Sequence, residues 1–307
     1  MFDKLRKNFR DLDDKFDSLQ QGGRPLPAYE SSSFQQAPAY EPSASQQAPP
    51  PFQTHFASMS MHAADALRFL SFPTPVIDAC RTTTRALWSG GIQREGGYGE
   101  SYEFKLTGYP WSSMGFSAMQ ARRLIAGLLG TLHGMGWVLT LNTDVSNSPG
   151  DKDTLLFRHQ TPPPAPCDWC SISFSRVDRM RLIDVSPEVC QTLCARLGQQ
   201  WVSRVGEYAP GIQEIKFHGY PWSASGTETM KVRGLLLIML ATLEEEGWTV
   251  YASVDQSRAG GSDNVGDTDT VSVLVSSGNE SWWLTVSQWH CCRLKGWERG
   301  TPVYHGR

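Results

Sequence analysis

The tetrapeptide Gly-Tyr-Pro-Trp occurs twice in this chain, at Gly108–Trp111 and again at Gly219–Trp222. The similarity extends beyond these four residues, because FKLTGYPWSSMG (104–115) aligns with IKFHGYPWSASG (215–226) at the same offset of 111 positions. A repeat of this length indicates that the chain carries one structural unit twice. This duplication restricts the fold more than any other feature of the sequence.

Further pairs of segments support the duplication. RMRLIDVSPEVCQTLCARL (179–197) resembles ALRFLSFPTPVIDACRTTTRAL (66–87), and DKDTLLF (151–157) resembles DTDTVSV (267–273) after a small insertion. CRLKGW (292–297) resembles an incomplete third copy of the strand in the first pair. We therefore expect two modules in tandem, with their elements in the same order.

Each copy shows the same succession of patterns. A strand is followed by a helix, a short strand into GYPW, a long helix and then further strands. The segment WTVYASVD (248–255) alternates apolar and polar residues, which is typical of a strand in a sheet with one covered face. The pattern predicts an α+β fold with two tandem duplicated modules. Each is a mostly antiparallel sheet packed by helices, and a disordered N-terminal tail precedes them.

The expected divisions of the chain follow from these patterns. They are an amphipathic helix over residues 1–20, a disordered Pro/Gln/Ser-rich tail over 21–62, a first module over 63–178, a second module over 179–298 and a C-terminal tail over 299–307. In this scheme only the two modules have cores of their own.

The repeated GYPW segment has a structural and a functional interpretation. Gly allows a tight exit from a strand, Pro ends the strand ladder, and Trp fills the space under the next helix. In the functional alternative, Trp111 and Trp222 face a ligand in a cleft between the copies. The repeated polar residues that would complete such a cleft are Arg122, Asp144, Arg233 and Asp255. Their structural interpretation is a repeated ion pair within each module.

The doubled module with its G-x-P-W motif resembles a group of proteins with the same arrangement, over about residues 66–297. This resemblance implies the duplicated fold. It attaches no activity to the chain.

The tail differs in kind from the rest of the chain, because Gln, Pro, Ser and Ala dominate residues 21–53. Such a segment cannot bury enough apolar surface to offset its ordering entropy, so we expect disorder. Within it, Leu26, Pro27 and Tyr29 form a motif that resembles the LPxY ligands of WW domains, and a weaker copy retains Pro38 and Tyr40. Such motifs bind through an extended Pro segment and a Tyr ring that fills an aromatic-lined pocket. The resemblance implies WW-domain proteins as partners, and the alternative is an inert spacer.

An apolar stripe precedes the tail. Its members recur at steps of three and four residues, and they are Phe2, Leu5, Phe9, Leu12, Phe16 and Leu19. This spacing places all six on one face of a helix, which would be marginally stable alone in water. We therefore expect the helix to dock on a protein surface. Peripheral contact with a membrane is the alternative, although the polar face mixes acidic and basic residues.

Two groups of residues have the character of metal ligands. Cys167-x-x-Cys170 has the spacing of a zinc pair, with His290, Cys291 and Cys292 as further candidates, and DNVGDTD (263–269) is rich in acids. Neither group completes a ligand motif, so ordinary thiols and a solvated hairpin loop are the preferred interpretations. The sequence contains no nucleotide-binding or hydrolase motif. We expect no metal, no cofactor and no catalytic residue.

Composition argues against several classes of function. The chain of 307 residues has a formal net charge of −3, which lacks the basic footprint of a nucleic-acid-binding protein. No run approaches about 18 apolar residues, and the N-terminus lacks the apolar core of a secretory signal. Seven irregularly spaced cysteines indicate reduced thiols. We expect a cytoplasmic protein without a nucleic-acid partner.

These observations together predict a non-enzymatic interaction or adaptor protein, in which a tandem α+β body carries a partner-binding tail. The alternative is a small-molecule-binding or enzymatic module pair that uses a cleft between the repeats. The surroundings of Trp111 and Trp222 distinguish the two, because convergent polar groups favour a ligand site whereas buried, hydrogen-bonded groups favour a structural role.

We predict that Phe9→Asp abolishes docking of the N-terminal stripe, because it places a charge in the middle of the apolar face. Each apolar side chain contributes about 1.5–3 kcal/mol when fully buried, so docking needs most of the stripe to be covered at once. Binding should also persist at high salt, since screening weakens charge pairs rather than apolar contacts. The measurement is co-sedimentation of peptide 1–20 with vesicles and, separately, with the folded modules. Equal binding by the wild-type and variant peptides would contradict the docking.

Overall fold

The computed structural model describes residues 54–143, 153–254, 271–277, 280–286 and 288–303. All of them belong to the unit Phe52–Arg307. The N-terminal stripe and both WW-ligand motifs lie outside the described residues, and so do Asp144 and Asp255.

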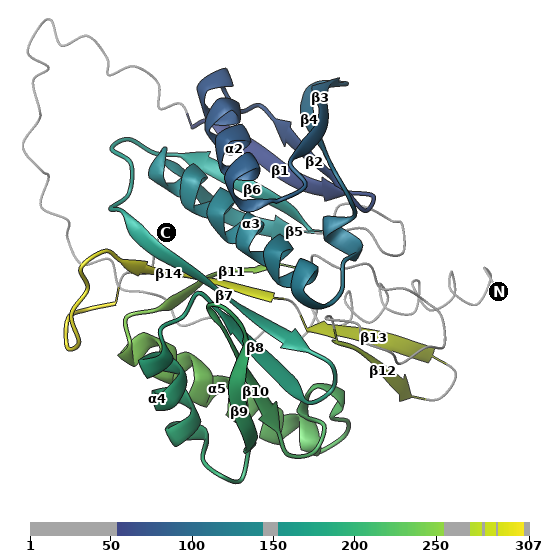
Figure 1. Cartoon of the computed structure of the whole chain (residues 1–307), viewed down its shortest axis with the longest axis vertical. Coiled ribbons are helices and arrows are strands. Elements are labelled where there is room, and N and C mark those ends of the chain that lie inside the picture. Colours follow the sequence, from purple (N-terminus) through teal and green to yellow (C-terminus); the bar gives the residue numbers. More distant parts are fainter. Residues whose placement is uncertain (1–53, 144–152, 255–270, 278–279, 287, 304–307) are drawn as a thin grey trace, which may run out of the picture. The chain divides into compact units, whose positions relative to one another are not determined.

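The first module is a six-stranded antiparallel sheet with two α-helices and one short 3-10 helix (Figure 1). Its strands are β1 (Phe56–His62), β2 (Ala66–Leu70), β3 (Ile92–Tyr98), β4 (Ser101–Leu106), β5 (Trp137–Thr143) and β6 (Thr154–His159). Its helices are α2 (Thr74–Leu87), the short 3-10 helix η1 (Pro110–Ser112) and α3 (Gly115–Gly134). Across the sheet the strands lie in the order β3-β4-β2-β1-β6-β5.

The second module repeats this arrangement. Its strands are β7 (Cys167–Ser175), β8 (Arg179–Ile183), β9 (Val202–Ala209), β10 (Ile212–Phe217), β11 (Thr249–Val254) and β14 (Gln288–Leu294). Its helices are α4 (Pro187–Leu197), η2 (Pro221–Ser223) and α5 (Glu228–Glu245). Read from β9, the order is β9-β10-β8-β7-β14-β11, so every strand has a counterpart at the same place in the first sheet.

The registers of the two sheets agree as well. Met59 lies opposite Phe69 across β1 and β2, and Ile172 lies opposite Leu182 across β7 and β8. The predicted fold class, two tandem antiparallel modules packed by helices, is therefore confirmed.

Both GYPW segments join a strand to a long helix, as the duplication predicts. Gly108 and Gly219 have positive φ values of 81° and 67°, which a residue with a side chain rarely adopts. The following tyrosines share one conformation, with φ of −132° in both and ψ of 65° and 67°. Pro then begins the 3-10 turn, which leads into α3 or α5.

The strand beside β7 in the second sheet is not the one whose sequence resembles β6. The similarity between 151–157 and 267–273 makes β12 (Val271–Ser277) the counterpart of β6, whereas β14 occupies that place beside β7. β12 pairs instead with β13 (Glu280–Val286) in a separate hairpin. CRLKGW is correspondingly the end of the closing strand and not a third copy. The sequence analysis named no pairing for β12, because periodicity does not reveal which neighbour a strand pairs with.

The modules also begin earlier than expected. β1 starts at Phe56, inside the segment expected to be a disordered tail, and β7 starts at Cys167, ahead of the expected boundary at 179. The alternation of Ser with Ala and Met in β1 is a weak strand signal beside a polar tail. β7 follows the first module closely in sequence, yet it pairs with β8 and β14 of the second sheet.

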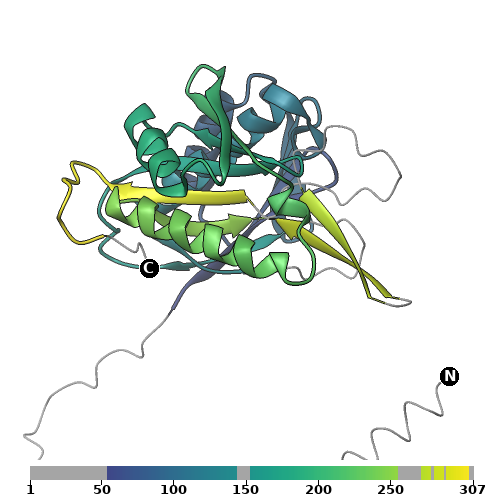
Figure 2. The ribbon, with the colours of Figure 1, turned by 90° about the horizontal axis from the view of Figure 1, so that it is seen from below.

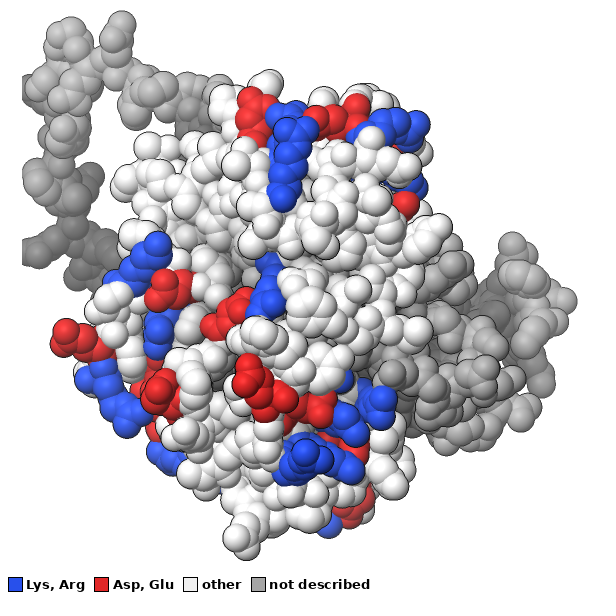
Figure 3. Space-filling model, in the orientation of Figure 1, with Lys and Arg blue, Asp and Glu red and all other residues white. Residues whose placement is uncertain are grey.

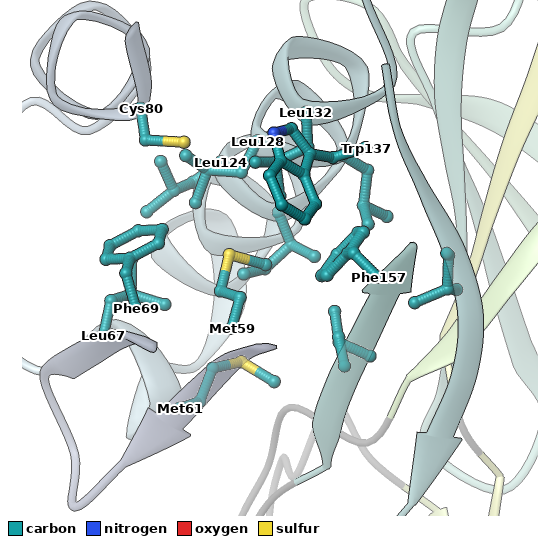
Figure 4. Close-up of a cluster of buried hydrophobic side chains, with 14 of the residues drawn as sticks. Met59, Met61, Leu67, Phe69, Cys80, Leu124, Leu128, Leu132, Trp137 and Phe157 are labelled. Atoms are coloured by element: carbon teal, nitrogen blue, oxygen red, sulfur yellow. The ribbon is translucent and has the colours of Figure 1, made fainter. Parts of the chain in front are cut away.

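Apolar side chains from the sheet and the helices form the core of the first module (Figure 4). Met59 and Phe69 extend from the sheet toward Leu124 and Leu128 of α3. The same cluster contains residues of the second module, and these are Cys167, Tyr251, Ala252, Val254 and Cys292. The two modules therefore share a core, with α3 in contact with both sheets. Within the described residues, no helix is both long and apolar enough to cross a membrane.

We predict that Trp222→Ala lowers the free energy of unfolding by about 3–5 kcal/mol, the usual cost of truncating a buried large aromatic residue. Trp222 is only 2% exposed, and its ring lies edge-on against Phe174 and Phe217. The measurement is urea unfolding. Tyr220→Ala, two residues away on the surface, is the matched control and should change stability by less than about 0.5 kcal/mol. Unchanged unfolding of Trp222→Ala would show that the indole does not support the core.

Candidate functional site

The structure places both repeated tryptophans in the interior. The indole N–H of Trp111 donates to the carbonyl of Ala66 at 3.0 Å, and that of Trp222 donates to the carbonyl of Arg179 at 2.8 Å. Each residue also donates its backbone N–H to a carbonyl of the preceding hairpin, at Ala64 and Val177. The GYPW segment thus fastens the start of the long helix to the β1–β2 or β7–β8 hairpin. Neither indole has an edge free for a ligand.

The repeated arginines lie in different environments. Arg122 is buried on α3 where that helix meets the second module, whereas Arg233 is exposed on α5 and contacts the sulfur of Met230 one turn away. Their expected ion-pair partners, Asp144 and Asp255, lie outside the described residues. The two arginines therefore do not occupy equivalent environments, although they hold the same position in the repeat.

Aromatic side chains fill the junction between the modules. The rings of His133, Trp169 and Tyr251 contact one another edge-on, with centroids 4.9–5.6 Å apart. The Tyr251 hydroxyl accepts the backbone N–H of Leu139 at 2.7 Å. This contact joins β11 to β5, so the two sheets are held at their edges as well as through α3.

A buried polar cluster lies beside these rings. The Ser171 hydroxyl is 2.9 Å from Nδ1 of His290 on the neighbouring strand and 3.5 Å from the backbone carbonyl of Arg122. All three residues are buried. Burial and, second, the positive charge of Arg122 lower the pKa of His290 to about 3, so its imidazole is neutral at physiological pH.

A serine bonded to a neutral histidine can suggest nucleophilic catalysis. Here His290 has no exposed surface and Ser171 almost none, so a substrate has no route to either atom. The cluster instead supplies hydrogen bonds where α3 crosses β7 and β14. The sequence analysis named His290 only as a metal candidate and missed Ser171, because their proximity depends on the β7–β14 pairing.

The cysteines of the CxxC segment point to opposite sides of β7, since residues three apart in a strand alternate faces. Cys167 lies with Cys292 on the side toward the first module, and Cys170 lies opposite Cys291 on the side toward α4 and α5. A hydrogen bond from Cys292 lowers the pKa of Cys167, whereas burial raises that of Cys170. The five zinc candidates therefore do not converge. Among the described residues, no cluster of three potential metal ligands occurs.

Two hollows on the described surface of the second module have a defined lining. One of about 350 Å³ is lined by Glu244, Glu245, Trp297, Arg299, Gly300 and Thr301. The other, of about 330 Å³, is lined by Pro187, Cys190, Gln191, Cys194, Val205 and Gln213. Neither contains a residue of the predicted inter-module cleft.

The tyrosines of the GYPW segments are the repeated residues that the sequence analysis overlooked. Tyr109 is 68% exposed and Tyr220 is 69% exposed, although the Pro and Trp that follow each of them are buried. On the first copy, Met114 and Phe116 are exposed in the same turn. The sequence could have indicated these residues, because Tyr is the one residue of the motif that has no role in forming the turn.

One family model matches the chain twice, over residues 55–158 and 168–274, and its description identifies a domain without naming an activity. The matches begin beside β1 and β7, at the observed starts of the two modules. Comparison with curated proteins and with solved structures gave no match.

We predict that the stability of the body depends on pH through His290. Its pKa is 6.5 when unfolded and about 3 when folded, so the unfolded chain binds a proton between these values and the folded chain does not. The free energy of unfolding should therefore fall as the pH drops below 6.5, by up to about 1.4 kcal/mol per pH unit for this group. His290→Gln retains a hydrogen-bonding side chain but does not titrate. The measurement is urea unfolding of both proteins from pH 7.5 to 4.

The difference between the two proteins isolates His290 from the other acid-sensitive groups. His133, whose pKa burial also lowers, is present in both and contributes equally. Wild type should lose more stability than His290→Gln over this range. Parallel curves would show that His290 takes up its proton in the folded state.

Proposed function

The chain belongs to the family of this twice-matched domain, and we propose that it acts as a non-enzymatic interaction or adaptor protein. In this proposal its two modules and its N-terminal tail contact protein partners, and the protein is cytoplasmic.

The observation that carries the proposal is the equal exposure of Tyr109 and Tyr220. Gly, Pro and Trp of the motif each meet a need of the turn, but the exposed ring of Tyr does not pack into the fold. An exposed Tyr suits a protein interface, because it combines a large apolar ring with a hydroxyl and loses little entropy on binding. Its presence at the same place in both modules supports two equivalent contact points.

The surroundings of Tyr109 extend this surface. Met114 and Phe116 are both about half exposed, and they lie at the start of α3, shortly after the motif. On the face shown in Figure 3, acidic and basic side chains are interspersed rather than gathered by sign. A contact driven by aromatic and apolar groups fits this charge pattern better than long-range electrostatic steering.

The tail adds a second class of contact to the proposal. Leu26, Pro27 and Tyr29 would bind a WW domain, and Pro38 and Tyr40 would give a weaker second site on the same segment of the chain. Two linked sites raise the overall affinity through effective concentration. The stripe Phe2–Leu19 would dock on protein, with peripheral membrane contact as the alternative.

A ligand-binding or enzymatic cleft between the repeats is less well supported. Side chains of both modules share one core at the junction, and the indoles of Trp111 and Trp222 bond to backbone carbonyls. A ligand site would require convergent polar groups around an accessible hollow.

We predict that the double variant Tyr109→Ala/Tyr220→Ala loses partners of the folded body while its stability stays within about 0.5 kcal/mol of wild type. Tyr29→Ala should remove WW-domain partners alone. The measurement is quantitative affinity capture from cells with the full-length protein, with unfolding curves for each variant. We expect enrichment of body partners to fall about tenfold, the effect of removing a central aromatic contact.

The matched control is Ser112→Ala/Ser223→Ala, which changes exposed residues of the same two turns. Any truncation for comparison should end at Pro51, since removal of residues 1–58 would cut into β1. Recovery of the same proteins by wild type and the tyrosine double variant would contradict the proposed contact points.

A further inference from the structure

Equivalent helices of the two modules differ in how much of their surface is covered. Met119 of α3 is fully buried, whereas its counterpart on α5, Met230, is 62% exposed. Ala126 is 6% exposed, whereas its counterpart Leu237 is 67% exposed. Figure 2 shows α5 along the outside of the second module, with no described element in front of it. α5 therefore leaves open the face that α3 buries.

The surface that covers α3 is the outer face of the second sheet. Ser171 and Ser173 of β7 are buried there, and their small side chains let the helix backbone approach to hydrogen-bonding distance of Ser171. Next to them, Met119 packs with Ile183 and Ile212 in a small separate cluster. The second sheet thus provides a surface for the helix, with Ser171 and Ser173 at its centre and Ile183 and Ile212 at its edge. We call this surface the seat.

The outer face of the first sheet has a similar seat. Ser58 and Ser60 of β1 take the places of Ser171 and Ser173, and Leu70 takes the place of Ile183. Phe56 and Leu70 are exposed on this face, at 57% and 39%.

An arginine–tyrosine–glutamate group flanks each seat. Arg68 lies 3.6 Å from the ring centre of Tyr98 and bonds to Glu103 at 2.8 Å. In the second sheet, Arg181 lies 3.9 Å from the ring centre of Tyr208 and bonds to Glu214 at 2.9 Å. Arg181 is buried in its seat, whereas Arg68 is partly open to solvent.

We propose that the exposed face of α5 docks on the outer face of the first sheet of a second copy, and so repeats between molecules the packing of α3 on the second sheet. This interface uses two different surfaces. Each copy in a pair therefore keeps one free helix face and one free sheet face, and association continues into chains or rings. The proposal is independent of the tyrosine contacts.

Changes of size at the contact compensate each other. Within the chain, Trp169 lies against Gly130 of α3, where an added Cβ would come within 2.9 Å of the indole. At the equivalent places the helix carries the larger Ala241 and the sheet carries the smaller Phe56. In the proposed contact, a larger side chain on the helix thus compensates for a smaller one on the sheet.

Charges at the proposed contact are complementary. His133 of α3 faces Trp169, which lies across the sheet from Cys292. The equivalent residues are Glu244 on α5, and Phe56 opposite Arg158 on the first sheet. Equivalent packing places Glu244 of one copy near Arg158 of the next, and both side chains are exposed in the single chain.

One contact within the chain has no counterpart between copies. Arg123 binds the Asp184 carboxylate with both Nε and Nη2, at 2.7–3.0 Å, and also donates to the carbonyl of Pro210. The matching residues are Gly234 and Ser71. We therefore expect association to be reversible and dependent on concentration.

Sedimentation equilibrium of the full-length protein tests the proposal with two surface variants. Leu237→Asp disables the helix face, and Phe56→Asp disables the sheet face. Wild type should increase in mass with concentration beyond a dimer, whereas each variant alone should stay monomeric, with a dissociation constant raised about tenfold or more. An equimolar mixture of the variants should form a dimer and nothing larger, because one intact face remains on each partner.

A charge exchange provides the second arm. Glu244→Arg and Arg158→Glu should each weaken association, and the chain that carries both should recover it. Wild type that remains monomeric, or a variant mixture that fails to dimerise, overturns the proposal. Loss of association on removal of residues 1–51 also overturns the proposal, because the N-terminal stripe, and not the sheet of a second copy, would then cover the exposed face of α5. Unfolding curves for both variants identify any loss of fold, and the charge-exchange chain then decides the outcome.

Discussion

The packing of α3 against two sheets is the constraint on which the rest of the described body depends. One side of this helix covers the core of the first module, and the other meets β7 and β14 of the second. Trp169 can lie against the helix only because residue 130 is Gly, since a Cβ there would be too close to the ring. The shared core then brings β5 and β11 together, where the Tyr251 hydroxyl and the Asn142 amide bond to backbone atoms of the partner strand region. The two modules therefore form one structural body rather than two independent domains on a linker.

Polar groups at this junction define its geometry. Ser171 lies within hydrogen-bonding distance of His290 and of the Arg122 carbonyl in a buried site. Arg123 donates hydrogen bonds to the Asp184 carboxylate from two nitrogens. Buried polar groups contribute little net stability, but they penalise any arrangement in which their partners are lost. The depressed pKa of His290 reflects the same condition, because a proton there would place a charge in a buried site and, second, near the positive charge of Arg122. The cluster thus fixes how α3 crosses the strands, while the apolar rings supply most of the burial.

The local pattern of the sequence predicted the duplication, the GYPW joints and the covered antiparallel sheets, because each depends on residues close in the chain. It did not predict that β14 closes the second sheet, because strand pairing over long separations leaves no local signal. It did not place β7 in that sheet, because the similarity between the copies was traced only from residues 66 and 179 onward. The candidate site shows the same limit. Packing was one of two interpretations that the sequence allowed for Trp111 and Trp222, but the different environments of Arg122 and Arg233 depend on which copy of the helix meets the other module. Repetition in the sequence shows that two residues hold the same position in their modules. It does not show whether the other module packs against that position.

The divergence of α3 and α5 follows from the number of surfaces that each helix contacts. A helix packed on several sides needs small residues where neighbours approach, and α3 has Gly127 against Leu87 of α2 and Gly130 against Trp169. α5 has Ile238 and Ala241 at these places, and it adds Leu237 on its open face. If that face were simply solvated, polar residues would be expected on it, as on the surface of most amphipathic helices. α5 instead stays apolar over much of its circumference. The first sheet keeps a serine-lined outer face, on which Phe56 takes the place of the larger Trp169. Compared with α3 and the second sheet, which cover each other, α5 carries larger side chains and the first sheet carries smaller ones. Because these two changes compensate, we regard the exposed face of α5 and the outer face of the first sheet as partners for each other.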